Sequence, residues 1–144
     1  GMDDLRPFLF DNKTPIPCYT HPTSRQTLEE SYPYIFRDGS YPGVPRLQLE
    51  EVTDTFTVED RYSGDSFVRV TPIEVLHGSL PVYGFRIDGF AYLTDTSEIP
   101  EERYAQLQNL DVLVLDALRH RPHRKHLSFE QAIRAANRME ADRT

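Results

Sequence analysis

Three stretches of alternating apolar and polar residues between positions 67 and 93 set the tightest limit on the fold. The first, residues 67–76, is followed by residues 82–87 and by Phe90–Leu93. The dipeptide Asp88-Gly89 separates the last two, and Asp-Gly between alternating stretches is a strong signal for a β-hairpin. We therefore expect consecutive antiparallel strands in the middle of the chain.

Helical patterns surround this region of strands. On its C-terminal side, we expect a helix over residues 99–107, a strand over Val112–Leu115 and a helix over residues 128–139. The last helix begins with Ser128 and Gln131, the spacing of a capping box. The continuous apolar strand before it is typical of a strand buried on both faces.

The N-terminal third gives weaker signals. Residues 23–36 have helical spacing, with Thr23 or Ser24 as the cap, and Pro33 predicts a stop or kink near Tyr32. The remaining elements are a short helical turn (3–10), short strands (15–21, 47–52 and 56–58), a loop (38–45) and a turn (63–65). The order of elements predicts one α/β or α+β domain over residues 1–144, a mixed sheet with helices on a face.

Composition excludes several classes of protein. Sixteen basic against 23 acidic residues give a net charge of −7, so we expect no nucleic-acid partner. The single cysteine, Cys18, excludes an intramolecular disulfide and a cysteine-cluster zinc site. No apolar stretch approaches the ~18 residues of a membrane span, and we expect no signal peptide. We expect a cytoplasmic protein without a membrane partner.

Two strand ends carry residues that bind metals. His77 ends one predicted strand, and Asp95 follows the next strand but one. Either residue alone is commonly structural, a hydrogen-bonded rim histidine or a turn-capping aspartate. Together they could converge on a cation such as Zn, Mn or Fe. Asp116, after Val112–Leu115, is either a second acceptor that orients a histidine or a turn residue.

The loop from Arg119 to His126 concentrates positive charge. It contains His120, His123 and His126 together with four fixed cations, and it leads into a capped helix. These groups suit a phosphate-like anion. A solvated basic loop is the alternative. A three-histidine zinc site is a weaker one, because the neighbouring cations oppose metal binding.

Several segments resemble the metallo-β-lactamase superfamily, in the subgroup similar to phosphoribosyl cyclic phosphodiesterase. The segments are 2–8 (MDDLRPF), 74–78 (EVLHG), 84–86 (GFR), 91–95 (AYLTD), 113–118 (LVLDAL) and 122–128 (PHRKHLS). The resemblance implies part of a four-layer αβ/βα sandwich with a dinuclear site for Zn, Mn or Fe. It also implies that His77 and Asp95 bind metal, that His123 and His126 act on the substrate side, and that the substrate is a small phosphodiester.

The chain departs from this family in one important respect. The family's His-x-His-x-Asp-His motif and its final histidine ligand are absent from residues 1–144. We therefore expect the middle part of a larger domain, which binds metal poorly and hydrolyses little by itself. An open sheet edge would then allow a homodimer.

Two other functions fit the residues. One is a non-catalytic α/β domain that binds an anion or a protein partner through the loop from Arg119 to His126. The other is a metal-free enzyme that uses Asp95 and His126 as acid and base, which requires both side chains in one cleft.

Overall fold

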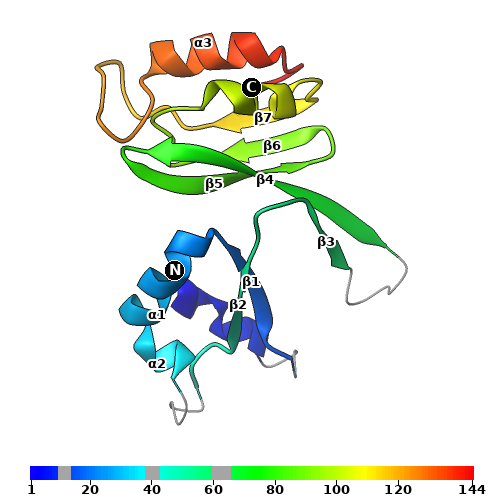
Figure 1. Cartoon of the computed structure of the whole chain (residues 1–144), viewed down its shortest axis with the longest axis vertical. Helices are drawn as coiled ribbons and strands as arrows, with labels where there is room; N and C mark the ends of the chain where they lie inside the picture. Colours follow the sequence, from blue (N-terminus) through cyan, green and yellow to red (C-terminus); the bar gives the residue numbers. More distant parts are fainter. Residues whose placement is uncertain (10–13, 38–42, 60–65) are drawn as a thin grey trace. The chain divides into compact units, whose positions relative to one another are not determined.

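A computed structural model describes residues 1–9, 14–37, 43–59 and 66–144 (Figure 1). The chain divides into two compact units, Gly1–Thr53 and Asp54–Thr144, and each is described by itself. The turn expected at 63–65 and part of the loop expected at 38–45 lie outside the described residues. The single domain expected from the chain length stays a prediction.

The first unit pairs two short parallel strands with small helices. Its elements are η1 (Met2–Leu9), β1 (Ile16–Thr20), α1 (Pro22–Ser31), α2 (Pro33–Phe36) and β2 (Leu47–Glu51). The predicted break at Tyr32 is confirmed, because α1 ends before it and α2 begins at Pro33. The predicted cap is wrong: His21 caps α1, and its Nδ1 accepts a hydrogen bond from the Thr23 amide at 3.2 Å.

The second unit contains a five-stranded sheet in the order β3-β4-β5-β6-β7. All neighbours are antiparallel except β6 and β7, which are parallel. The expected antiparallel centre of the chain is therefore confirmed. The strands are β3 (Phe56–Glu59), β4 (Phe67–His77), β5 (Leu80–Ile87), β6 (Phe90–Leu93) and β7 (Val112–Leu115).

Two helices complete the second unit: η2 (Glu101–Leu107), a 3-10 helix, and α3 (Phe129–Met139). The predicted capping box of α3 is present in full. The helix expected over residues 99–107 is confirmed, with the 3-10 form and the shorter bounds Glu101–Leu107. Side chains bind its last carbonyls, because Arg86 Nη1 donates to Gln106 O at 2.6 Å and Gln108 Nε2 donates to Tyr104 O at 2.9 Å.

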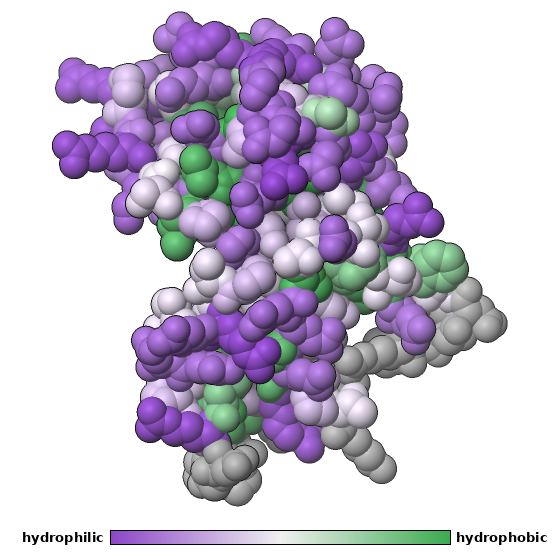
Figure 2. Space-filling view, in the orientation of Figure 1, coloured by the Kyte–Doolittle hydropathy of each residue, from purple (hydrophilic) through white to green (hydrophobic). Residues whose placement is uncertain are grey.

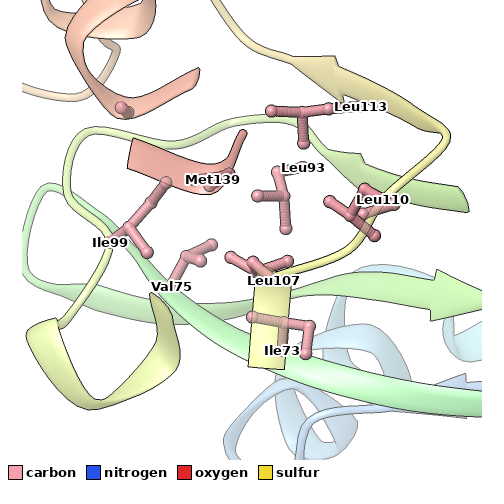
Figure 3. Close-up of a cluster of buried hydrophobic side chains, with 10 residues drawn as sticks. Ile73, Val75, Leu93, Ile99, Leu107, Leu110, Leu113 and Met139 are labelled. Carbon is pink, nitrogen blue, oxygen red and sulfur yellow. The ribbon is translucent and has the colours of Figure 1, made fainter. Parts of the chain in front are cut away.

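The core of the second unit lies between one face of the sheet and the two helices (Figure 3). Alternate residues of the strands point into it, as the period of two in a β-strand requires. Met139 of α3 and Leu107 of η2 meet them and are fully buried. The cluster consists of Ile73, Val75, Ala91, Leu93, Ile99, Leu107, Leu110, Leu113, Ala135 and Met139.

The face of the molecule over α3 in Figure 2 is largely hydrophilic, although Phe129 and Ile133 of this helix are also exposed. The exposed residues of α3 include Glu130 and Arg134, which form an ion pair at 2.6 Å one turn apart. In the part of the chain that the structure describes, no helix combines the length and the apolar character needed to cross a membrane.

Candidate metal centre

Strand directions bring the polar residues of the second unit to one rim of the sheet. Strand β5 is antiparallel to both β4 and β6, and β6 is parallel to β7, so β4, β6 and β7 all end at the same rim. His77 is the last residue of β4, Asp95 follows β6 by two residues, and Asp116 directly follows β7. The carboxyl ends of these strands therefore place an imidazole and two carboxylates side by side.

Among the described residues, His77, Asp95 and His126 form a group that could hold a metal ion. One ligand atom from each lies within 4.8 Å of the others. The two imidazole rings meet edge to face, with centroids 4.8 Å apart. Two histidines and a carboxylate are a donor set that Zn²⁺ accepts in catalytic sites, which have three protein ligands and an open position. The residues present therefore fit the metal that the resemblance implies.

Hydrogen bonds at Nδ1 fix the tautomer of both histidines. His77 Nδ1 lies 3.0 Å from the Asp95 carbonyl oxygen, which can only accept, so this Nδ1 carries the proton. His126 Nδ1 lies 2.6 Å from Asp116 Oδ2 and donates to that carboxylate. In both neutral rings, Nε2 then holds the free lone pair. Metal-binding histidines characteristically have such an oxygen acceptor on their second nitrogen.

The segment around Thr96 holds His126 in place. Asp116 Oδ2 also accepts from the Thr96 amide at 3.2 Å, and Thr96 O accepts from the Leu127 amide at 2.7 Å. Thr96 itself is fully buried. Its backbone therefore connects the end of β6, the carboxylate after β7 and the residue next to His126.

Asp95 differs from the two histidines in exposure and backbone geometry. Its side chain is 71% exposed, whereas that of His126 is 20% exposed. Its φ of 51° lies in the left-handed region, which aspartate enters more readily than most residues but at a cost. Such backbone strain is typical of functional sites.

His123 lies beside the group without joining it. Its ring centroid is 5.3 Å from that of His126, and its Nδ1 accepts from the Lys125 amide at 3.2 Å. Desolvation lowers the pKa of His123, and the charge of Arg119 lowers it further. This histidine therefore favours its neutral form.

His120 packs on the Phe129 ring, with centroids 4.8 Å apart, and among the described residues it is not part of the group that could hold a metal. The described residues therefore give no support to a three-histidine zinc site. The acid–base alternative stays open, because His126 Nδ1 is 4.0 Å from Asp95 Oδ1, within reach through one water.

Sequence reasoning placed His77 with Asp95 and suggested that Asp116 orients a histidine. It assigned His126 to the substrate side and missed how close its ring lies to His77. The missing signal was the path of residues 117–127, which depends on long-range backbone bonds such as Leu127 N to Thr96 O. Whether any of these residues binds a metal stays a prediction.

A family model shows the family of the chain, and solved structures share its fold. A model of the β-lactamase superfamily domain matches residues 1–144. A diphosphatase from the PhnP family has a TM-score of 0.79 at 30% identity, covering 98% of this chain and 51% of its own. The Zn²⁺-bound PqqB from Methylobacterium extorquens has a TM-score of 0.50 at 16% identity, covering 92% of this chain and 48% of its own.

A curated relative has a different kind of name. An octanoyltransferase of Porphyromonas gingivalis (strain ATCC BAA-308 / W83) is 33% identical over 136 residues. The match covers 92% of this chain but only 26% of that protein. The chain thus spans about half the length of the solved structures and about a quarter of the curated relative.

Proposed function

The chain belongs to the metallo-β-lactamase superfamily and has its mixed α/β fold, and on that basis we propose that it carries part of the metal site of a phosphoester hydrolase. His77 and Asp95 would hold a divalent cation, Zn, Mn or Fe. The observation that supports this most is the pair of Nδ1 hydrogen bonds, which direct the lone pair of each neutral ring, His77 and His126, to Nε2. The diphosphatase neighbour favours a small phosphorylated substrate.

A cation held here would supply positive charge that polarises a phosphoryl oxygen. The protein's own part begins with Asp95, whose exposed carboxylate faces the two imidazoles. His126 would move a proton at Nε2, because Asp116 holds Nδ1 and stabilises the ring when it is doubly protonated. His123, next to His126, would line the substrate side.

The 4.8 Å spacing also favours a second role for His126, as a third ligand to the cation. The two roles make different predictions for H126A. A ligand role predicts loss of bound metal. A proton-transfer role predicts that metal is kept while the rate of hydrolysis falls by about 100-fold or more.

The direct test measures metal content by elemental analysis after loading with Zn²⁺, Mn²⁺ or Fe²⁺, for the chain and for H77A and D95N. Because the chain carries only part of the family's ligand set, we expect the unchanged chain to bind metal weakly but measurably, and each variant to lose most of it. H120A is the matched control, because His120 belongs to the same loop but packs on Phe129. A chain that retains no metal, or variants that retain as much as H120A, would refute the proposed site. Hydrolysis of bis(p-nitrophenyl) phosphate is then compared across the same set.

The alternative function, anion binding through the loop from Arg119 to His126, is favoured by one observation. Among the described residues, the side chains of Arg121, Arg124 and Lys125 form no ion pair with a carboxylate, and all three are exposed. The Arg119 side chain instead stabilises the loop, because it donates hydrogen bonds to the carbonyl oxygens of Arg121 and Pro122.

Titration with inorganic phosphate separates the two functions. If the loop binds anions without a metal, the metal-free chain binds phosphate, and R124A with K125A weakens that binding while H77A does not. If the metal site dominates, phosphate binding follows metal loading and H77A abolishes it.

A further inference from the structure

We propose, resting on the function above, that Ser97 is a positioning residue that fixes the direction in which His77 leaves strand β4. Its hydroxyl donates to the carbonyl oxygen of Leu76 at 2.8 Å. The Ser97 hydroxyl oxygen in turn accepts from the amide of Gly78, also at 2.8 Å. One hydroxyl thus holds the peptide groups on both sides of His77.

The backbone around Ser97 strengthens this connection. The Ser97 amide donates to Leu76 O at 2.7 Å, and the Leu76 amide donates to Glu98 O at 2.9 Å. The bond between His77 Nδ1 and Asp95 O closes the arrangement at 3.0 Å. The segment that carries Asp95 is therefore tied to the segment that carries His77 at three successive residues, 76, 77 and 78.

The hydroxyl matters most to Gly78. The Leu76 carbonyl keeps backbone donors when the hydroxyl is removed, whereas the described structure gives the Gly78 amide no partner other than Ser97. Gly78 has a φ of 69°, and a Cβ at this position would lie 3.4 Å from Lys125 Cγ. The turn after His77 therefore depends on a residue without a side chain and on the one hydrogen bond that its amide donates to Ser97. Losing that bond frees the turn and lets the His77 ring rotate.

The backbone hydrogen bonds around Ser97 also explain why loss of its hydroxyl should have only a local effect. The core residues Val75 and Leu93 are fully buried on either side of this segment and do not use the hydroxyl. We therefore expect removal of the hydroxyl to loosen the site without unfolding the sheet. Removing a hydrogen bond that orients a metal ligand typically weakens metal affinity by about 10- to 100-fold.

The test compares S97T with S97V, which have the same shape and differ only in the hydroxyl. Co²⁺ is titrated into each and followed by its visible absorption, and the nitrogen resonances of the His77 ring are recorded without metal. We expect S97V to bind Co²⁺ about tenfold more weakly than S97T, which is near the smallest loss of metal affinity usually seen when a residue that orients a metal ligand is changed. We also expect S97V to lose the Nδ1-protonated signature of His77. T55A is the matched control, because the Thr55 hydroxyl bonds to Thr71 elsewhere in the same unit, at 2.9 Å.

Equal Co²⁺ affinity and spectra for S97T and S97V would overturn the positioning role, even if the Gly78 amide exchanges faster in S97V. If neither variant nor the unchanged chain binds Co²⁺, the proposed function fails, and the His77 ring resonances decide the positioning role alone. Identical resonances in the two variants would then overturn it, and a shift confined to S97V would support it.

Discussion

The two compact units differ most in how much apolar surface they bury. The second unit has a cluster of ten buried hydrophobic residues between one face of its five-stranded sheet and its helices. In the first unit, Ile35 and Leu49 are the buried hydrophobic residues among those described, and α1 buries none of its side chains. Its two-stranded sheet is of a size that is marginal in isolation. All residues of the candidate site belong to the better-packed unit, so its rim offers a rigid frame.

Separating the two units is the strongest test of this difference in packing. We expect residues 54–144 to fold alone and to keep a cooperative thermal transition, because their core is complete within the unit. Residues 1–53 should lose most of their secondary structure. Circular dichroism of the two fragments measures both outcomes. A folded 1–53 with an unfolded 54–144 would reverse the comparison.

A matched pair of core truncations gives the next largest effect. L93A removes a fully buried side chain from the second unit and should cost about 3 kcal/mol of its unfolding free energy. L49A, at a site that is 8% exposed in the first unit, should cost less, below about 2 kcal/mol, because its surroundings can relax. Native-state hydrogen exchange measures each unit separately. Equal losses would show that the first unit is as tightly packed as the second.

A helix cap provides a smaller effect. S128A removes the hydroxyl that accepts from the Gln131 amide and breaks the reciprocal capping box of α3. We expect a loss of about 1 kcal/mol in the second unit. The conservative variant S128T keeps the hydroxyl and serves as the control in urea unfolding. Indistinguishable midpoints for S128A and S128T would contradict a stabilising cap.

The reactivity of the Cys18 thiol reports how well the first unit shields a side chain from water. Burial raises the pKa of the Cys18 thiol above its ordinary value. The folded chain should therefore form less thiolate and react with iodoacetamide more slowly than the urea-unfolded chain at the same pH.

The same pKa shift predicts how stability depends on pH. The neutral thiol is favoured in the fold, so its contribution is complete below the unfolded pKa and is lost as pH rises through the raised folded value. C18S should lack this alkaline loss. Equal alkylation rates for the folded and unfolded chains would show that the first unit does not shield the thiol.

Local signals allowed most elements to be predicted. The capping box at Ser128 and Gln131, the break at Pro33 and the Asp88-Gly89 hairpin each depend on neighbouring residues, and the structure contains all three. The prediction that was wrong, the cap of the first helix, involves an unusual residue, because a histidine is not a preferred N-cap. The helix at η2 was predicted but its 3-10 form was not, and the Arg86 side chain reaches it from a strand about 20 residues away in sequence.

The site could be predicted only in part, for a similar reason. The alternation of apolar and polar residues and the direction of the strands are enough to predict that His77, Asp95 and Asp116 lie at one rim. The position of His126 depends on a loop without regular structure, fixed by bonds from Asp116 and Thr96. Periodicity carries no information about such a loop, so its contribution becomes visible only in three dimensions.

Because β4, β6 and β7 end together, the opposite rim carries none of the candidate ligands. The hairpin between β5 and β6 turns there at Asp88 and Gly89. A fluorescent label or an affinity handle attached at the exposed Asp88 would lie away from the candidate ligands. It would offer a point for immobilising the protein at the rim opposite the candidate site.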